Sequence, residues 1–316
     1  MQTAWDVGVD VASQSVVVAS AGRDFAPHSV GNERGALRRW LQALPAGSRI
    51  GMEATGAYHQ LLAELAHAAG MTVYVLNPRD IKKYAEGVGR RGKTDRLDAE
   101  VIARYVAHEH AELHVYAPRS AAAERLEQLL KRRAKVVQLQ VTLAQTWRGV
   151  AGVKAELAEV AAAQARLLAR VDGLLEEAVD ALPEVRTRAQ QVRAIPGYGR
   201  LGSVAVAHAL QRLPFTRVDA FIAHTGLDPR PCDSGAKHGR RRISKRGPAA
   251  LRTLMHMCAM AASRTPTWRP YYQRQLAKGL SGTEALVILA RKMARTAYGV
   301  CRCATPFDPV RVLSGT

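Results

Sequence analysis

Residues 5–20 read WDVGVDVASQSVVVAS, and this stretch decides the fold of the N-terminal third. Two runs of β-branched and apolar residues, 5–12 and 15–20, are separated by a short polar break. This pattern predicts two paired strands, and residues 25–30 are expected to add a third. Asp10 interrupts the first apolar run. Because a lone carboxylate is costly to bury, Asp10 is a candidate for a chemical role.

The segments that follow alternate between helix and strand. The expected elements are a helix over 33–44, a strand over 49–54, a helix over 58–69 and a strand over 72–76. This order predicts a mixed α/β sheet covered by helices on both faces. Three glycines between residues 87 and 92 predict a loop. Thr94 or Asp95 is then expected to cap a helix that ends near Val106.

The rest of the chain is predicted to be mainly helical. No proline occurs between Arg119 and Leu182, and leucine and valine recur there at helical spacing, with a break at Gly149 and Gly152. This predicts a long helical hairpin, which is either a coiled coil that makes oligomer contacts or an ordinary pair of packed helices. Pro183 is expected to open a linker. The further helices expected are 201–210, 249–262, 265–276 and 283–300.

Composition indicates a folded protein with a polyanionic partner. The chain has 316 residues, 47% of them hydrophobic, and a net charge of +19. Residues 191–316 hold 21 Lys and Arg against 5 Asp and Glu, whereas residues 1–100 hold 12 and 11. The positive charge is therefore concentrated in the C-terminal part, which is typical of a nucleic-acid-binding domain.

Several other classes of protein are not favoured. The four cysteines do not make a disulfide framework in a chain of this length. The N-terminus lacks the basic and apolar regions of a signal peptide, and no apolar run approaches membrane-spanning length. We expect a cytoplasmic, nucleoid-associated protein of bacterial type with no membrane partner.

Four acidic residues form the first candidate site. Asp10 lies on the first expected strand, Glu53 ends a later strand, and Asp95 and Asp98 are three residues apart at the start of a helix. If the two strands are neighbours, these carboxylates can converge on a divalent cation such as Mg²⁺ or Mn²⁺. The alternative is that Asp95 favours the helix dipole, that Asp98 lies on a solvated face and that Glu53 is a strand-end charge.

A serine followed by a basic tract forms the second. Ser234 precedes a stretch, 237–252, with seven Lys and Arg and no carboxylate. A hydroxyl beside this much positive charge lies where a phosphate of DNA would dock. The alternatives are that Ser234 is a plain turn residue and that the tract is a solvated charge run. The residues expected to contact nucleic acid here are Lys237, Arg240, Arg241, Arg242, Lys245, Arg246 and Arg252.

Two further positions are expected to contact nucleic acid. Gly197 and Gly199 form a Gly-x-Gly turn before a helix, where backbone N–H groups can face a phosphate. The same pattern also serves many plain turns. Lys93 lies in the glycine-rich segment immediately before Asp95.

Taken together, the blocks GVDVAS, EATGAY, KTDRLDAE and DSGAKHGRRRISKRGPAALR resemble the DEDD-type transposases of the Piv-related insertion-sequence family. The resemblance spans nearly the whole chain in order. It implies an RNase H-like (RuvC-like) domain at 1–118, a helical hairpin or coiled coil at 119–190 and a mainly α transposase domain at 191–316. Asp10, Glu53, Asp95 and Asp98 would be the metal-binding catalytic tetrad, and Ser234 the nucleophile.

The resemblance also implies partners. Members related to the best-understood branch are guided by a structured bridge RNA that pairs with donor and target DNA, and they work as oligomers from dimer to tetramer. The expected activity is therefore site-specific cleavage and rejoining of double-stranded DNA through a phosphoserine intermediate. Alternatives are a RuvC-like metal nuclease that uses water, which leaves no protein–DNA adduct, and a non-catalytic nucleic-acid-binding protein.

Overall fold

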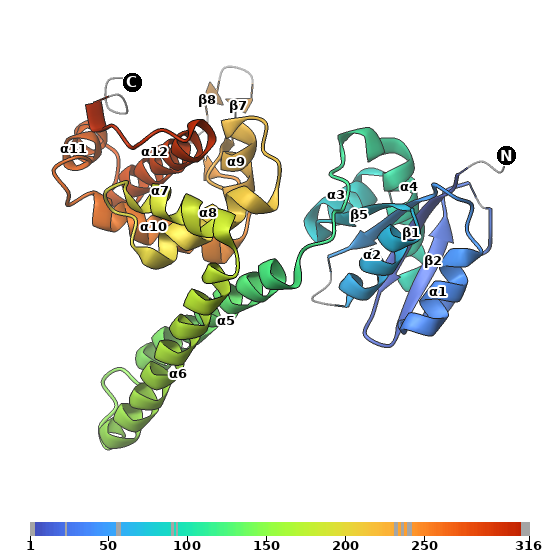
Figure 1. Cartoon of the computed structure of the whole chain (residues 1–316), viewed down its shortest axis with the longest axis horizontal. Helices are drawn as coiled ribbons and strands as arrows, with labels where there is room; N and C mark the ends of the chain where they lie inside the picture. Colours follow the sequence, from blue (N-terminus) through green and yellow to red (C-terminus); the bar gives the residue numbers. More distant parts are fainter. Residues whose placement is uncertain are drawn as a thin grey trace. The chain divides into compact units, whose positions relative to one another are not determined.

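The computed structural model divides into two compact units, Met1–Arg119 and Ser120–Thr316 (Figure 1). It describes residues 4–22, 24–54, 58–89, 92, 94–230, 233–234, 237–238 and 242–310. The helical hairpin, predicted as a separate segment, belongs to the second unit. Lys93, Arg240 and Arg241, predicted to contact nucleic acid, lie outside the described residues.

The N-terminal unit is a mixed α/β structure. Its five-stranded sheet has the order β3-β2-β1-β4-β5, with β1 antiparallel to β2 and parallel to β4. The strands are β1 (Asp6–Val11), β2 (Ser15–Ser20), β3 (His28–Gly31), β4 (Arg49–Glu53) and β5 (Thr72–Leu76). The helices are α1 (Arg34–Gln42), α2 (His59–Ala68), α3 (Pro78–Gly87) and α4 (Asp95–Glu109), followed by the 3₁₀ turn η1 (His110–Glu112). The predicted order of strands and helices is confirmed as far as β5, and α3 was not predicted.

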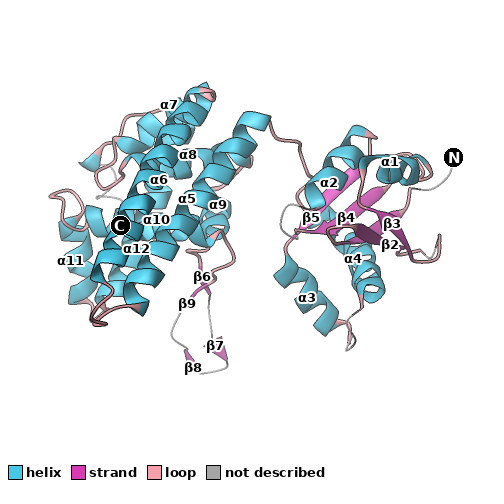
Figure 2. Cartoon of the chain, turned by 90° about the horizontal axis from the view of Figure 1, so that it is seen from below, coloured by secondary structure: helices cyan, strands magenta, loops and turns pink. Residues whose placement is uncertain are grey.

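Helices cover both faces of this sheet (Figure 2). Successive side chains of a strand point to opposite faces, and the odd-numbered valines of β1 pack with α1 and α2 in one apolar core. The other face is covered by α4, which packs closely on two glycines, Gly8 of β1 and Gly51 of β4. The valine pattern of residues 5–11 therefore explains why α1 and α2 pack on one face of the sheet. The two glycines explain how α4 packs so closely on the other.

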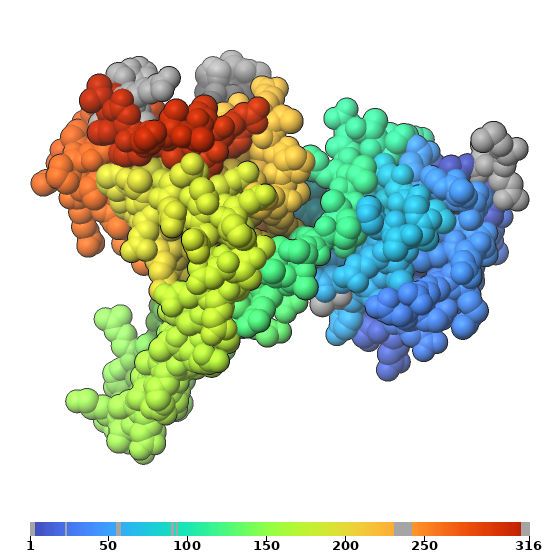
Figure 3. All heavy atoms as spheres, in the orientation of Figure 1, coloured from blue at the N-terminus to red at the C-terminus, as the bar shows by residue number. Residues whose placement is uncertain are grey.

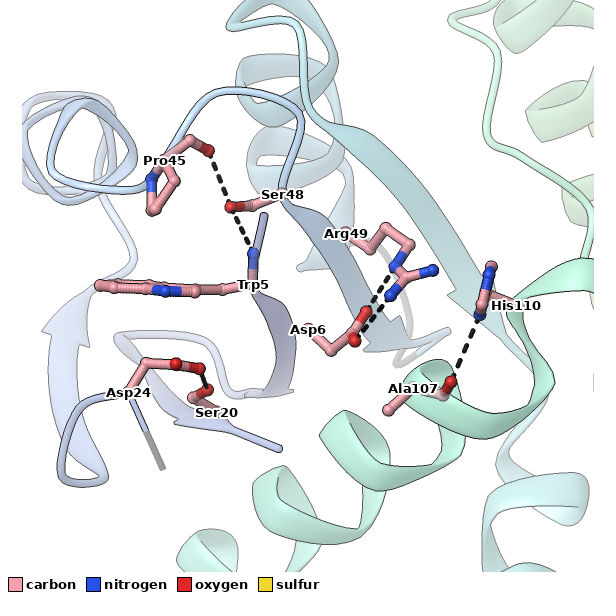
Figure 4. Close-up of polar contacts among 9 residues, drawn as sticks. All are labelled: Trp5, Asp6, Ser20, Asp24, Pro45, Ser48, Arg49, Ala107 and His110. Carbon is pink, nitrogen blue, oxygen red and sulfur yellow. Dashed lines mark hydrogen bonds and ion pairs between the residues drawn. The ribbon is translucent and has the colours of Figure 1, made fainter. Parts of the chain in front are cut away.

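Polar contacts fix the beginning of the central strands (Figure 4). The Arg49 guanidinium donates to both carboxylate oxygens of Asp6, at 2.5 and 2.7 Å, where β4 pairs with β1. The buried Ser48 hydroxyl donates to the Pro45 carbonyl and accepts from the Trp5 backbone N–H. These contacts fix the register of β1 and β4 where the two strands begin, at the opposite end of β1 from Asp10.

The second unit is mainly helical. Its helices are α5 (Ala121–Thr146), α6 (Lys154–Asp180), α7 (Pro183–Arg193), α8 (Arg200–Arg212), α9 (Val218–Thr225), α10 (Ala249–Ala262), α11 (Arg269–Ala277) and α12 (Gly282–Cys303). Between α9 and α10 lie four two-residue strands, β6 (Pro229–Arg230), β7 (Asp233–Ser234), β8 (Lys237–His238) and β9 (Arg242–Ile243). The core is centred on α8, whose residues 202–210 are all buried, and contains the fully buried Trp268, whose indole N–H donates to the Pro196 carbonyl at 2.9 Å.

The predicted hairpin is formed by α5 and α6 (Figure 1). In the space-filling view its green to yellow-green atoms project from the rest of the helical unit (Figure 3). It is joined to the rest of its unit by a small apolar cluster that includes Leu126 and Leu175. Arg133 of α5 forms a bidentate ion pair with Asp172 of α6. Farther out, apolar residues such as Leu139 and Leu167 are about half exposed, at 50% and 49%. Whether this part of the hairpin makes oligomer contacts stays a prediction.

The sequence interpretation failed at Pro183, which does not open a linker, because it is the first residue of α7. The strand predicted over 72–76 is confirmed as β5, and Pro78 begins α3, a helix that was not predicted. The Asn77 side chain caps α3 by accepting from the Arg79 N–H. Proline is well suited to the first helical turn, since its missing N–H would have no partner there. Among the described residues, none of the helices is both long and apolar enough to cross a membrane.

Candidate active site

The strand register brings Asp10 and Glu53 together. In the parallel pair β1–β4, Gly8 lies opposite Gly51 and Val9 opposite Met52. Continuing this register by one residue places Asp10 opposite Glu53, and neighbouring strands are about 4.8 Å apart. Both acids follow a glycine by two residues, so they lie on the glycine face of the sheet, which α4 covers.

The glycines also determine how close α4 lies. A Cβ atom at position 8 would be 2.1 Å from the Ala99 carbonyl oxygen and 2.2 Å from the Ala103 nitrogen. The backbone of α4 is therefore in direct contact with the backbone of β1. Only glycine allows this approach, because any side chain would overlap with main-chain atoms that cannot move aside.

The first turn of α4 adds two more carboxylates. Thr94 caps the helix as predicted, since its hydroxyl accepts from the Leu97 N–H at 3.2 Å. Asp95 is exposed and Asp98 is half-buried. Acidic residues in a first turn favour the helix dipole, which is a sufficient structural reason for either of them alone.

The four acids are coupled electrostatically through Asp10. The pKa of the Asp10 carboxyl is raised from 3.8 to about 6, first by burial and then by the negative charges of Asp95, Asp98 and Glu53, while a hydrogen bond from the Val11 backbone lowers it. Nearby like charges disfavour ionisation in this way. The charges of Glu53, Asp95 and Asp98 all act on Asp10, so the structure brings these residues near one another, and their role as metal ligands stays a prediction.

The donor set fits a hard divalent cation. Mg²⁺ prefers carboxylate oxygens and keeps several of its waters, so it needs only one or two carboxylates in direct contact. Within the described part of the chain, no group of three or more His, Cys, Asp or Glu side chains is placed so that it could hold a metal ion. The four carboxylates therefore do not form a preformed metal cage, and a cation among them would offset the negative charge around Asp10.

Ser234 lies at the end of a short β-ribbon in the helical unit. The ladder β7–β8 pairs Asp233 with His238 and Ser234 with Lys237. A second ladder, β6–β9, pairs Arg230 with Arg242 nearer to the helices. Ser234 was predicted either as a nucleophile or as a turn residue, and both stay predictions.

The ribbon is anchored to α9 by backbone contacts. Gly226 ends α9 with a left-handed conformation, φ 70°, and a Cβ atom at Gly247 would be 1.9 Å from the His224 carbonyl oxygen. The Ser244 N–H donates to the Asp228 carbonyl, and the Ser244 hydroxyl donates to the Asp228 side chain. The sequence blocks GLD and SKRG, 15 residues apart, are therefore packed against each other.

The predicted nucleic-acid contacts differ in their surroundings. Arg242, Lys245 and Arg246 are exposed. Arg252 is only half-exposed, and its Nη1 donates to the carbonyl oxygens of Gly247 and Thr225, at 3.1 and 3.5 Å. The structure thus gives Arg252 a role in holding the ribbon anchor, which the charge pattern could not show.

The Gly-x-Gly turn has a packing explanation for its first glycine. Gly197 has φ 97°, and a Cβ atom there would be 2.4 Å from the Ala262 Cβ atom. Gly199 precedes the first residue of α8 and has open space around it. That Gly197 and Gly199 contact nucleic acid stays a prediction. Of the two glycines, only Gly199 has open space beside it into which a phosphate could fit.

Comparison with known proteins is informative for both units. Residues 7–151 match a transposase family profile of the DEDD IS110 type, and residues 189–273 match the profile of the transposase IS116/IS110/IS902 family. The first match contains all four acids, and the second contains the whole β-ribbon. The chain belongs to the IS110-type transposases. It is thus an enzyme of DNA transposition or recombination.

Relatives of this IS110-type transposase include DNA-inverting proteins. The pilin gene-inverting protein of Moraxella lacunata is 29% identical over 86% of each chain, and that of Moraxella bovis is 28% identical over the same shares. A probable family 20 transposase of Pseudomonas aeruginosa is 28% identical over 96% of this chain and 98% of its own length.

One sequence signal for the acidic site was missed. This IS110-type transposase carries the same spacing, Gly-x-acid, in both central strands, as Gly8-Val9-Asp10 and as Gly51-Met52-Glu53. A glycine two residues before an acid, in each of two adjacent parallel strands, indicates one face where a helix can approach closely and two carboxylates can emerge beside it. This pattern, used alone, would have placed Asp10 beside Glu53.

Proposed function

We propose that this chain cuts and rejoins DNA at specific sites by transesterification through Ser234, assisted by divalent cations at the acidic site of Asp10, Glu53, Asp95 and Asp98. The observation that carries the proposal is the convergence of these four acids: the pKa of Asp10 is raised to about 6, first by burial and then by the negative charges of Asp95, Asp98 and Glu53. Crowded carboxylates with a perturbed pKa are typical of functional sites. A divalent cation bound among them would offset their negative charge.

We also infer that the N-terminal unit has an RNase H-like fold. The support is its strand order, with three antiparallel strands followed by two parallel ones. An acid on the first strand, an acid at the end of the fourth and a helix that crosses the sheet with two more acids complete the resemblance.

The acidic residues would hold Mg²⁺ or Mn²⁺. When bound, such ions stabilise negative charge on the attacking and leaving oxygens of a phosphodiester. The contribution of the chain itself is to orient the four carboxylates. Asp10 and Glu53 are fixed by the paired strands, and Asp95 and Asp98 by the capped first turn of α4.

The proposed chemistry conserves the energy of the phosphodiester. The Ser234 oxygen attacks phosphorus, an O–P bond forms, and the bond between phosphorus and the 3′ oxygen breaks. The serine loses its proton to a base, and the released 3′ oxygen gains one. The reverse attack by a 3′ hydroxyl rejoins the strand and restores the serine. Exposed Arg242, Lys245 and Arg246, which follow the ribbon in sequence, would bind the flanking phosphates.

We further infer that a structured bridge RNA guides the choice of site and that two to four copies of the chain act together. The concentration of positive charge in residues 191–316 supports two polyanionic partners, DNA and RNA. The half-exposed apolar residues on the outer part of the hairpin support self-association. The relatives named as gene-inverting proteins and transposases make inversion and transposition the two reactions to test.

The experiment is a covalent-capture assay with the full chain and a plasmid that carries the gene with its native flanking DNA, which would also encode the guide. Wild-type protein with Mg²⁺ should give protein–DNA adducts on a denaturing gel. Ser234→Ala should abolish them. Ser244→Ala is the matched control, because Ser244 is the other serine near the tract and contacts Asp228, so its loss should reduce adducts without removing them.

The two halves of the proposal fail separately. If Ser234→Ala still forms adducts, the nucleophile is wrong. If wild-type protein cuts DNA without any adduct and Asp10→Asn abolishes cutting, the metal site stands and the chain is a nuclease that uses water. If Asp10→Asn and Asp98→Asn cut and rejoin as well as wild type, the metal site is wrong.

A further inference from the structure

A hollow of about 480 Å³ lies between α10, α11 and α12, in the helical unit. We call it the α10–α12 pocket. Its volume is within the range of roughly 300–1,000 Å³ that is usual for small-ligand sites. It is lined by Met260, Ser263, Arg264, Arg269, Tyr272, Gln273, Leu276 and Leu286. In the sequence this pocket lies apart from the serine ribbon, and nothing in the proposed chemistry uses it.

Two arginines stand at the rim of the pocket. Arg264, just after α10, and Arg269, the first residue of α11, are exposed, and within the described residues neither side chain has an ion pair or hydrogen bond. Uncommitted guanidinium groups on either side of a hollow are suited to a phosphate, which they can bind with two parallel N–H···O contacts.

The surroundings strengthen the positive potential. Between residues 249 and 310 there are nine Lys and Arg and only two acids, Glu284 and Asp308. Glu284 is engaged in the capping box of α12, where it accepts from the Ser281 N–H and hydroxyl at 3.0 and 2.7 Å. Burial lowers the pKa of Lys292, and the charges of Arg295 and Arg274 lower it further, which shows how closely the cations gather beside α11. A pocket in such a field attracts anions.

The inner wall of the pocket is aromatic and apolar. Tyr272 is half-buried, and its hydroxyl is 3.4 Å from the position that a Cβ atom of Gly282 would take, so the tyrosine reaches from α11 to the start of α12. Met260 and Leu286 are also half-buried beside it. A ring with apolar neighbours and a cationic rim matches a planar base joined to a phosphate, since bases bind proteins by stacking on aromatic side chains.

We propose that the α10–α12 pocket binds one unpaired nucleotide of a polynucleotide, with its base against Tyr272 and its phosphate between Arg264 and Arg269. The base must be unpaired, because in a duplex both faces of each base are covered by its neighbours. Both RNA loops and displaced DNA strands present such a nucleotide. The inference rests on the pocket alone and does not require Ser234 to be the nucleophile.

The test measures binding of fluorescein-labelled ten-nucleotide oligomers of uridine and of thymidine, with a duplex DNA of equal length for comparison. Tyr272→Leu removes the ring and keeps an apolar side chain. It should weaken binding of the single strands about fivefold or more and change duplex binding less than twofold. Arg264→Ala with Arg269→Ala should also lower the salt dependence of single-strand binding, by about 0.7 in slope for one phosphate released.

A control outside the pocket and a second pocket variant complete the test. Arg148→Ala with Arg166→Ala removes an equal charge from exposed positions of the helical hairpin, outside the pocket, and should leave the preference for single strands unchanged. Gln273→Glu places a negative charge at the exposed rim without touching the core, and should weaken single-strand binding even if Tyr272→Leu misfolds. Equal weakening of uridine and thymidine oligomers supports any unpaired nucleotide, and weakening of one alone assigns the source to RNA or to DNA.

The proposal is overturned if Tyr272→Leu folds and binds single strands like wild type. It is also overturned if the pocket variants weaken single strands and duplex to the same degree, because the arginines would then only add to a general positive surface. Covalent catalysis can persist or fail independently in these variants, so the result does not depend on the outcome of the adduct assay.

Discussion

The acidic site and the serine ribbon are built in opposite ways. The acids are carried by a sheet and a helix whose backbones touch at Gly8, and the apolar core behind them is continuous. The ribbon consists of two-residue strands that are held to α9 through a few contacts at Gly226, Asp228 and Gly247. One region therefore sets its chemistry by packing, and the other by backbone contacts and positive charge.

This difference has a consequence for stability. A packed site stores electrostatic repulsion, because its rigid backbone keeps like charges together. The ribbon strands are held by few contacts, so loss of one anchor contact should displace them without unfolding the helical unit. Changes at the acidic site should thus affect the whole N-terminal unit, whereas changes at the ribbon should affect binding before they affect folding.

The largest effect is expected for Gly8→Ala. The new Cβ atom would be 2.1 Å from the Ala99 carbonyl oxygen, so α4 must move away or the unit must unfold. We expect a loss of at least about 3 kcal/mol in the free energy of unfolding, measured by urea denaturation. Any folded fraction should have lost Mn²⁺ binding, because Asp95 and Asp98 move with α4. Gly35→Ala is the control, since its Cβ has space on the exposed side of α1 and should be neutral or stabilising.

Gly247→Ala should have the second-largest effect. Its Cβ atom would be 1.9 Å from the His224 carbonyl oxygen, which separates the ribbon from the end of α9. Duplex DNA binding and adduct formation should fall at least tenfold, while the helical circular dichroism signal stays within a few per cent. Gly173→Ala, in open space on α6, should retain full binding. A Gly247→Ala protein with wild-type DNA binding would show that the anchor does not position the ribbon.

Asp10→Asn tests the cost of the negative charge on Asp10, which comes first from burial and then from the neighbouring carboxylates. The Asp10 pKa is 3.8 when the chain is unfolded and about 6 when it is folded, so the folded state binds more protons between these pH values. Stability therefore falls as the pH rises through this window, and the full cost is present above pH 6. Without divalent cations at pH 7.5, Asp10→Asn should raise the melting temperature by about 2–4 °C, for about 1 kcal/mol after discounting for solvent screening.

The pH and metal dependence distinguish this effect from better packing. At pH 4 the gain from Asp10→Asn should nearly vanish, because the wild-type carboxyl is then mostly neutral. Added Mg²⁺ should stabilise wild type at pH 7.5 and have little effect on the variant. Glu64→Gln, which removes an exposed carboxylate on α2, should show neither behaviour. A gain from Asp10→Asn that is equal at pH 4 and pH 7.5 would contradict the repulsion.

The two regions also differ in how far the sequence predicts them. Valine alternation predicted β1 and β2. The four acids were predicted to share a site, and in the structure the charges of the other three act on Asp10. The start of α7 at Pro183 was missed, because proline both ends and begins helices and only the following pattern decides between them. The helix α9 and the anchor between Asp228 and Ser244 were also missed, since contacts between separated segments leave no local periodicity. Arg252 shows the same limit, because its charge does not reveal that it donates to two backbone carbonyls.

The smallest effect is expected when that arginine is replaced. Arg252→Lys keeps the positive charge but loses the planar guanidinium that donates to the Gly247 and Thr225 carbonyls. The free energy of unfolding of the helical unit should therefore fall by about 1 kcal/mol. The salt dependence of DNA binding should be unchanged, because no phosphate contact is lost. Arg246→Ala, at an exposed position, should do the reverse, with a salt slope lower by about 0.9 and stability nearly unchanged. If Arg252→Lys lowers the salt slope instead, Arg252 contacts DNA directly, as its charge first suggested.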